Sequence, residues 1–178
     1  MTMSPKEIES RIKKIRLLIL DVDGVLTDGH IAYGDYGDEL KYYDVLDGFG
    51  IQLLRKGGIQ TAIITNRKSR TNSRRAKELH IPHVYQDASD KLSVFVDVLR
   101  KLRVAPEEAC CIGDDLVDIP LLSRCGFAVA VQNAVPEVKR VAHYVTAKSG
   151  GRGAIREVAD KVLKVQGKWT HVAEKYFS

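Results

Sequence analysis

The stretch LLILDVDGVLTDG, residues 17–29, is the strongest structural signal in this chain. It begins with four apolar residues in a row, and two carboxylates, Asp21 and Asp23, follow almost at once. An unbroken apolar run of this length is typical of a strand that is buried on both faces of a parallel sheet. Similar runs recur at residues 62–64, 109–112 and 127–131. Helical patterns separate these runs, so the sequence predicts an α/β fold with a mainly parallel sheet and right-handed crossovers.

The composition is typical of one globular domain. The chain has 178 residues, of which 44% are hydrophobic and 29% charged, so we expect residues 1–178 to form a single domain with its own core. The net charge of +5 suits an anionic ligand. The densest basic stretch, residues 67–77, has no interleaved aromatic residues and is typical of a polar helix face. This pattern argues against a nucleic-acid partner.

Cysteine usage and the lengths of the apolar runs indicate the compartment. Cys110, Cys111 and Cys125 are odd in number and lack CxxC spacing, so we expect buried free thiols in a reducing environment. The first apolar run stops after four residues, which is too short for a secretory signal or a membrane-spanning helix. The sequence therefore predicts a cytoplasmic protein with no membrane partner.

Short polar residues and glycines mark the ends of the expected helices. We expect Asp47 to cap a helix that ends at Gly57, and Asp90 to cap a later one. Gly126 is expected to end a third helix. A last helix is expected at about residues 153–166.

Residues 30–43 break the alternation of strands and helices. Two β-prone arms flank a turn-rich centre there, which predicts a β-hairpin inserted after the first strand. A lone hairpin is marginally stable in water, so we expect its arms to pack on something else, with another subunit as one candidate. We expect the tail, residues 170–178, to be mobile.

Chemically active side chains follow several of the predicted strands. In an open parallel sheet, ligands bind beyond the carboxyl ends of the strands, so these side chains are expected to share one site. They are Asp21, Asp23, Thr65, Lys91, Asp114, Asp115 and Asp118. Carboxylates this close repel by roughly 4 kcal/mol per pair at 4 Å and an effective dielectric near 20, which implies a bound cation. Because no histidine or cysteine accompanies these hard oxygens, Mg²⁺ is favoured over zinc.

The remaining groups indicate a phosphoryl ligand. Lys91 opens a helix, where the helix dipole disfavours a cation unless an anion faces it. Asp21 is ionised at neutral pH and needs no base to act as a nucleophile. Asp23 lies two residues along the extended chain and points the same way, so it is placed for general acid–base work.

Four motifs of this sequence resemble those of the haloacid dehalogenase phosphatase superfamily. They are residues 21–29, Thr65, Lys91 and residues 113–118, and the match covers roughly residues 15–168. The resemblance implies a three-layer Rossmannoid fold and a phospho-aspartyl intermediate on Asp21, with Asp23 as acid and base. It also implies Mg²⁺ on Asp21, the Asp23 carbonyl and Asp114, with Asp115 and Asp118 behind the metal. Thr65 and Lys91 would hold the phosphoryl oxygens.

Further pieces, at residues 47–51 and 150–157, resemble the capless branch of that superfamily that acts on sugar phosphates. This resemblance implies a Mg²⁺-dependent phosphomonoesterase for 3-deoxy-D-manno-octulosonate 8-phosphate, in the synthesis of lipopolysaccharide precursors. It also implies no cap domain and a homotetramer. In that branch the hairpins pack into a central barrel, and a neighbouring subunit closes each active site.

Substrate preference is expected to depend on residues near Thr65. Arg67 is the residue type found in octulosonate-8-phosphate enzymes of this branch, whereas enzymes for nine-carbon, sialic-acid-type 9-phosphates tend to have Glu there. Asn66 replaces the usual glycine and is expected at the rim of the substrate site. Arg75 is expected to reach a neighbour's site. Arg152, in a glycine-rich segment, is expected either to bind an anion or to stand beside a tight packing turn.

Two other classes of protein stay open from the residues alone. A response-regulator receiver also combines acidic residues, Thr and Lys on a parallel sheet, but it places its acidic pair before the phosphorylated Asp. A non-catalytic assembly subunit is expected to have lost one of the catalytic residues, and none is altered here. His80 and His83 have no third ligand nearby in the sequence, so they are assigned to structure or surface.

Overall fold

The computed structural model describes residues 3–177, and its centre is a six-stranded sheet. The strands of this sheet are β1 (Leu17–Leu20), β4 (Gln60–Ile64), β5 (His83–Tyr85), β6 (Ala109–Gly113), β7 (Phe127–Ala130) and β8 (Tyr144–Val145). Their order is β5-β4-β1-β6-β7-β8, and every neighbouring pair is parallel. The predicted α/β fold is confirmed. Because β1 lies inside the sheet, its carboxyl end is flanked by those of β4 and β6.

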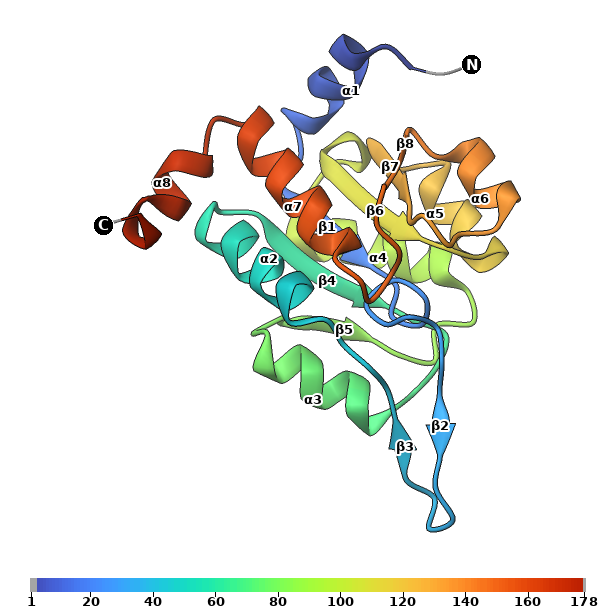
Figure 1. Ribbon diagram of the computed structural model, residues 1–178. Helices are drawn as coiled ribbons and strands as arrows, with labels where there is room; N and C mark the ends of the chain where they lie inside the picture. Colours follow the sequence, from blue (N-terminus) through green and yellow to red (C-terminus); the bar gives the residue numbers. More distant parts are fainter. Residues whose placement is uncertain (1–2, 178) are drawn as a thin grey trace.

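Helices cover both faces of the sheet and make the three layers (Figure 1). The α-helices are α1 (Pro5–Ile12), α2 (Val45–Lys56), α3 (Arg70–Glu78), α4 (Lys91–Leu102), α5 (Ile119–Leu122), α6 (Pro136–Val141), α7 (Ala154–Val165) and α8 (Trp169–Ala173). Three short 3-10 helices are η1 (Pro106–Glu108), η2 (Leu116–Asp118) and η3 (Glu174–Tyr176). Helix α2 packs against α7 on one face, while α4 packs against α5 on the other. Among residues 3–177 there is no cap domain, and no helix is long and apolar enough to cross a bilayer.

The predicted hairpin is present between β1 and α2. Strands β2 (Ala32–Tyr33) and β3 (Glu39–Leu40) pair antiparallel, and the hairpin projects away from the sheet (Figure 1). Tyr33, Leu40 and, at the tip, Tyr36 are exposed.

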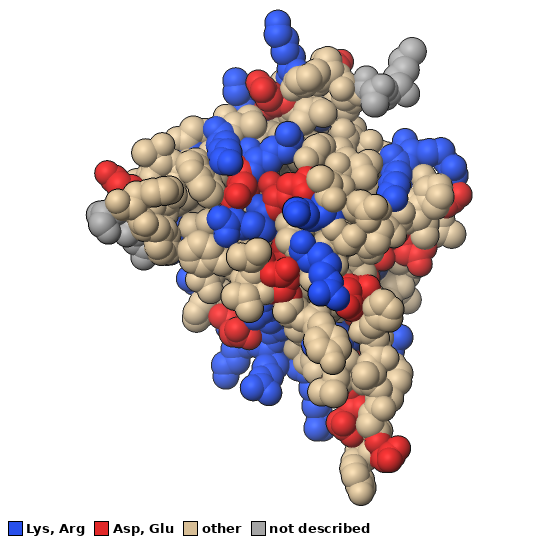
Figure 2. Space-filling model, viewed as in Figure 1, with Lys and Arg blue, Asp and Glu red and all other residues tan. Residues whose placement is uncertain are grey.

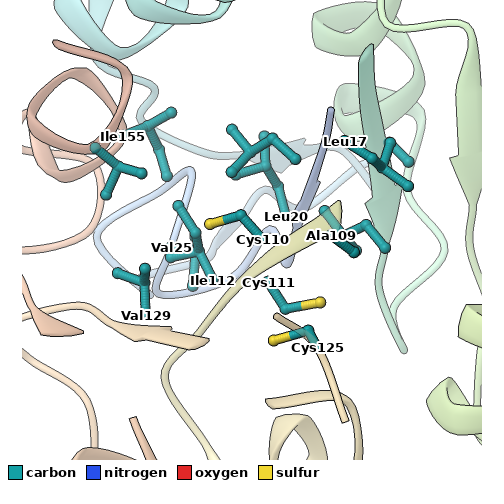
Figure 3. Close-up of a cluster of buried hydrophobic side chains, with 14 of the residues drawn as sticks. Leu17, Leu20, Val25, Ala109, Cys110, Cys111, Ile112, Cys125, Val129 and Ile155 are labelled. Carbon is teal, nitrogen blue, oxygen red and sulfur yellow. The ribbon is translucent and has the colours of Figure 1, made fainter. Parts of the chain in front are cut away.

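The core strands are buried on both faces, as their apolar runs predict. Figure 3 shows that Cys110 and Cys111, neighbours on β6, point to opposite sides of the strand, and that the side chains of Cys111 and Cys125 lie close together. All three cysteines are buried and free, which confirms the expected free thiols. Burial raises the pKa of the Cys110 and Cys111 thiols well above the usual range.

The prediction that Asp47 caps α2 is wrong. The helix begins at Val45, and Asp44 is its cap, accepting a hydrogen bond from the Leu46 N–H at 2.6 Å. Asp47 is buried inside the first turn and caps α7 instead: its carboxylate accepts from the N–H groups of Gly153, at 3.2 Å, and Arg156, at 2.8 Å. A carboxylate at a helix N-terminus accepts hydrogen bonds from the free N–H groups there and interacts favourably with the helix dipole. Asp47 therefore links α2 to α7 through hydrogen bonds.

Two other helix-end predictions had different outcomes. Asp90 caps α4, accepting from the Ser93 N–H at 3.1 Å, as expected. Gly126 does not end a helix, because α5 is already capped at Ser123. Instead it allows a close approach: a side chain at this position would overlap the backbone of Glu107.

The tail, which the sequence predicts to be mobile, contains short helices. Helix α8 and η3 occupy residues 169–176, and Val172 and Ala173 are buried. Ser178 lies outside the described residues. The mobility of this segment, like the single-domain organisation, stays a prediction.

Candidate active site

The loop after β1 is built to present two carboxylates. Thr27 is buried and holds the loop closed: its hydroxyl accepts from the N–H groups of Gly24 and Gly29, both at 3.2 Å, and donates to the Val22 carbonyl at 3.3 Å. Gly24 has a φ of +87°, and a Cβ there would overlap the Asp114 carboxylate. Only glycine fits this position, because it combines a left-handed backbone with the absence of a side chain.

Most of the predicted site residues meet around one cavity of about 230 Å³. It lies where β1, β4 and β6 end and α4 begins. Its lining residues are Asp21, Asp23, Thr65, Asn66, Arg67, Lys91, Asp114, Asp115 and Val117. The sheet topology therefore brings together side chains that are far apart in the sequence.

Lys91 lies at the bottom of the site and is only 3% exposed. Its ammonium nitrogen is 3.0 Å from Asp21 Oδ1 and 2.7 Å from Asp118 Oδ1. Burial alone would lower the pKa of Lys91, but the two carboxylates raise it above the usual range. Lys91 is therefore a fixed positive charge beside Asp21.

Asp118 has both carboxylate oxygens occupied. Oδ1 accepts from Lys91, while Oδ2 accepts from the N–H groups of Asp114, at 3.0 Å, and Asp115, at 3.3 Å. This arrangement suits a residue that orients Lys91 and the Asp114 backbone rather than one that binds a metal directly. Asp115 is exposed and caps η2 through the Leu116 N–H, at 2.7 Å.

The carboxylates fit a hard divalent cation. Oxygen atoms of Asp21, Asp114 and Asp118 lie within 4.8 Å of one another. Asp114 Oδ1 is buried and has no hydrogen-bond partner among the described residues, which leaves it available to a cation. Burial and then the neighbouring carboxylates raise the pKa of Asp114 to about 8. Burial and Asp118 raise that of Asp21 to about 6, against the opposing effect of Lys91.

These shifts show which groups hold protons without a cation. Burial and the neighbouring carboxylates raise the pKa of Asp114 further than that of Asp21, so Asp114 holds a proton up to a higher pH than Asp21 does. The all-oxygen set of Asp21 and Asp114 suits Mg²⁺, which would supply positive charge beside these carboxylates.

Asp23 is held by two cations at the side of the cavity. Its Oδ1 lies 2.7 Å from the Lys41 ammonium, and its Oδ2 lies 3.5 Å from Nε of Arg67. Arg67 also donates to the Tyr33 hydroxyl at 3.0 Å. Both arms of the hairpin thus contact groups of the site.

Two predicted substrate-binding residues lie outside the cavity. Arg75, on α3, donates to the Asp44 carbonyl at 2.9 Å and pairs with Glu78 at 2.8 Å. Arg152 is exposed and pairs with Asp28 at 3.3 Å. Neither reaches the site of its own chain, and their contact with a substrate stays a prediction.

The glycine-rich segment serves packing in this chain. The Gly151 N–H donates to the Val25 carbonyl at 3.0 Å, and the Gly150 N–H donates to the Asn133 side chain at 2.7 Å. Asn133 in turn donates to the Gly24 carbonyl at 3.0 Å. These donors are used within the fold, which favours the tight-turn interpretation over an anion-binding loop.

The predicted basic stretch forms a solvated face. Arg70, Arg74 and Lys77 are exposed on α3, and Figure 2 shows Lys and Arg side chains gathered at the lower edge of the molecule in that region. The helix supplies no exposed aromatic side chain beside them, as the sequence predicts.

Sequence reasoning missed Lys41, Asn72 and Asn133. Lys41 contacts Asp23, Asn72 contacts Lys41, and Asn133 bridges the loops of Gly24 and Gly150. Each is a single polar residue with no motif of its own. No local pattern in this chain marks them.

The comparisons with known proteins agree with this geometry. A family model for haloacid dehalogenase-like hydrolases matches residues 78–157. The 3-deoxy-D-manno-octulosonate 8-phosphate phosphatase KdsC of Escherichia coli is 48% identical over 162 residues, which cover 91% of this chain and 86% of the relative.

Solved structures of two such phosphatases match in three dimensions. The one from Yersinia pestis has a TM-score of 0.90 and 47% identity, covering 91% of this chain and 88% of the other. The one from Moraxella catarrhalis, in complex with magnesium, phosphate and KDO, has a TM-score of 0.95 and 40% identity, covering 97% and 99%. At this identity and coverage, the chain belongs to the 3-deoxy-D-manno-octulosonate 8-phosphate phosphatases of the haloacid dehalogenase-like hydrolase family.

Proposed function

We propose that this protein hydrolyses 3-deoxy-D-manno-octulosonate 8-phosphate to the free sugar acid and phosphate, with Mg²⁺ as cofactor, in the synthesis of lipopolysaccharide precursors. The observation that carries the proposal is the pairing of Lys91 with Asp21 beside the unpartnered Asp114 oxygen. A receiver module is disfavoured, because Asp21 follows the first strand and the cluster of Asp114, Asp115 and Asp118 follows a later one. A non-catalytic subunit is disfavoured by the intact site.

The reaction divides into two displacements at phosphorus. First, starting with the Asp23 carboxyl group protonated, an Asp21 oxygen forms a bond to phosphorus, the ester P–O bond breaks, and the sugar oxygen takes that proton from Asp23. Second, Asp23 accepts a proton from water as that water attacks phosphorus, which releases phosphate and restores Asp21. Lys91 and the Thr65 hydroxyl hold the phosphoryl oxygens throughout.

The metal would be held by the carboxylates of Asp21 and Asp114 and by the carbonyl of Asp23. When bound, it neutralises the charge that Asp21 and the phosphoryl oxygens bring together. Asp118 and Asp115 keep the surrounding loop in place through their hydrogen bonds.

A substrate panel tests the reaction and the choice of sugar. We expect turnover of octulosonate 8-phosphate with Mg²⁺ to exceed that of a nine-carbon ulosonate 9-phosphate, and chelation by EDTA to remove both. Arg67 lines the cavity, and a charge-assisted hydrogen bond to the sugar carboxylate is worth about 1.5–3 kcal/mol. Arg67→Met should therefore raise KM for the eight-carbon substrate on the order of 10–100-fold. A wild-type preference for the nine-carbon sugar would contradict the substrate assignment, and full turnover in EDTA would contradict the Mg²⁺ requirement.

We propose further that the protein is a cytoplasmic homotetramer in which a neighbouring subunit closes each site. The exposed aromatic side chains of the hairpin support this, since Tyr36 is fully exposed in the isolated chain and Tyr33 is 67% exposed. The three free thiols suit a reducing compartment. Light scattering at assay concentration should give a mass near four times 19.8 kDa, and Tyr36→Asp should lower it. An active wild-type monomer would contradict closure by a neighbour.

A further inference from the structure

Lys41 is a buried lysine in a hairpin that is otherwise largely exposed. It follows β3, and its side chain has no solvent exposure. The ammonium nitrogen lies 2.7 Å from Asp23 Oδ1 and 3.4 Å from Glu39 Oε1, and it donates to Asn72 Oδ1 at 3.0 Å. Three oxygen partners match the three N–H groups of an ammonium. One hydrogen bond and two ion pairs thus hold the Lys41 ammonium group in place.

Asn72 anchors this arrangement to the body of the protein. It is 1% exposed, on α3, and its Oδ1 also accepts from the Tyr43 hydroxyl at 3.1 Å. Its amide nitrogen donates to the Arg67 carbonyl at 3.2 Å and to the Gln86 side chain at 3.2 Å. Lys41 is thus held by α3 and by the loop that carries Arg67.

The consequence falls on the two oxygens of Asp23. Oδ1 is buried against Lys41, while the side chain as a whole is 24% exposed. Oδ2 is therefore the oxygen that faces the cavity, with the Arg67 guanidinium 3.5 Å away. An ion pair at each oxygen favours one orientation of the carboxylate, which keeps Oδ2 directed toward the cavity.

We propose that Lys41 is a positioning residue for catalysis: it holds Oδ1 of Asp23 so that Oδ2 is aimed at the oxygen of the leaving group. This inference rests on the proposed function, because it needs Asp23 to give a proton to the sugar oxygen. Through Lys41, the hairpin would take part in the chemical step as well as in subunit assembly. Lys41 touches neither the phosphate nor the leaving group and acts through Asp23.

The test compares two substrates whose leaving groups differ in how much they need to be protonated as they leave. A sugar alkoxide must be protonated as it leaves, whereas p-nitrophenolate is stable enough to leave without a proton. The value of kcat/KM reports on the first displacement, in which the leaving group departs. For Lys41→Met we expect kcat/KM for octulosonate 8-phosphate to fall on the order of 100-fold. For p-nitrophenyl phosphate we expect a change of about threefold or less. A uniform loss on both substrates would overturn the proposal.

Two further variants separate positioning from general damage. Lys41→Arg retains the positive charge but not the arrangement of contacts to Asp23, Glu39 and Asn72. We therefore expect kcat/KM for octulosonate 8-phosphate to fall about tenfold, with little change for p-nitrophenyl phosphate. If Lys41→Met does not fold, as thermal melting will show, Lys41→Arg carries the test alone. Arg100→Met is the matched control, because it removes a cation from an ion pair that is exposed on α4, and it should leave both substrates unchanged.

A double-mutant cycle shows whether Lys41 acts through Asp23. In single turnovers of the sugar phosphate, Lys41→Met should cause no further loss once Asp23 is replaced by Asn. An equal fold loss in both backgrounds would contradict the proposal. The two possible failures are distinguishable: if the wild-type protein cleaves neither phosphate ester, the proposed function fails, whereas wild-type activity with additive losses overturns only the role of Lys41.

Discussion

Asp21→Asn is expected to lower kcat/KM for octulosonate 8-phosphate by on the order of 10⁴-fold or more, because it removes the nucleophile. The substitution is nearly isosteric. Asp21 is 8% exposed and is fixed by Lys91 at 3.0 Å, so an amide can occupy the same position without a cavity. The loss should therefore appear in the chemical step and not in folding.

The covalent intermediate gives this prediction a second readout. Acid quenching during wild-type turnover should trap an acyl phosphate that hydroxylamine cleaves, and Asp21→Asn should trap none. Asp97→Asn, an exposed carboxylate on α4, is the matched control and should retain turnover and trapping. Hydrolysis by Asp21→Asn within tenfold of wild type would refute the assignment of Asp21 as nucleophile.

The main features of the site were predictable because they depend on strand ends. Asp21, Thr65 and Asp114 each follow a buried apolar run, and a parallel sheet places the carboxyl ends of neighbouring strands along one edge. Once the runs are identified as strands, the meeting of these residues follows from topology. Lys91 was predictable for a different reason, since a cation at a helix N-terminus needs an anion nearby.

The parts that escaped prediction depend on contacts between distant segments. Lys41 and Asn72 are 31 positions apart, and nothing local indicates that the hairpin folds back against α3. Asp44 and Asp47 are both plausible caps for α2, and only the packing of α2 on α7 shows which helix each one serves. The contact of Arg75 with the Asp44 carbonyl also depends on tertiary packing, and the expectation that Arg75 reaches a neighbour's site stays a prediction.

Lys91→Met is expected to damage both catalysis and stability. Its ammonium nitrogen lies between Asp21 and Asp118, and Lys91 is almost completely buried. Removing one partner of a buried ion pair leaves an uncompensated charge and costs about 3–5 kcal/mol of unfolding free energy. The variant also loses the cation that holds the phosphoryl group, so kcat should fall on the order of 10³-fold even with Mg²⁺.

The loss of stability should depend on pH with a definite sign. A carboxyl group whose pKa is higher in the folded protein binds more protons there than in the unfolded chain, so its contribution falls as pH rises. For Asp114 in the wild type, this loss of stability occurs between about pH 4, the pKa of an aspartate in the unfolded chain, and about pH 8, its pKa in the folded protein. Without Lys91 the carboxylates hold protons still more strongly. The variant should therefore be much less stable than wild type at pH 8 and closer to it at pH 5.

Denaturant unfolding at both pH values, with and without MgCl₂, measures this difference. Mg²⁺ should recover more stability in Lys91→Met than in wild type at pH 8, because it then supplies positive charge beside Asp21 and Asp114. Arg100→Met, exposed in the last turn of the same helix, is the matched control and should show no such dependence. If the gap between Lys91→Met and wild type were the same at pH 5 and pH 8, Lys91 would not be compensating these carboxylates, and the electrostatic account of the site would be wrong.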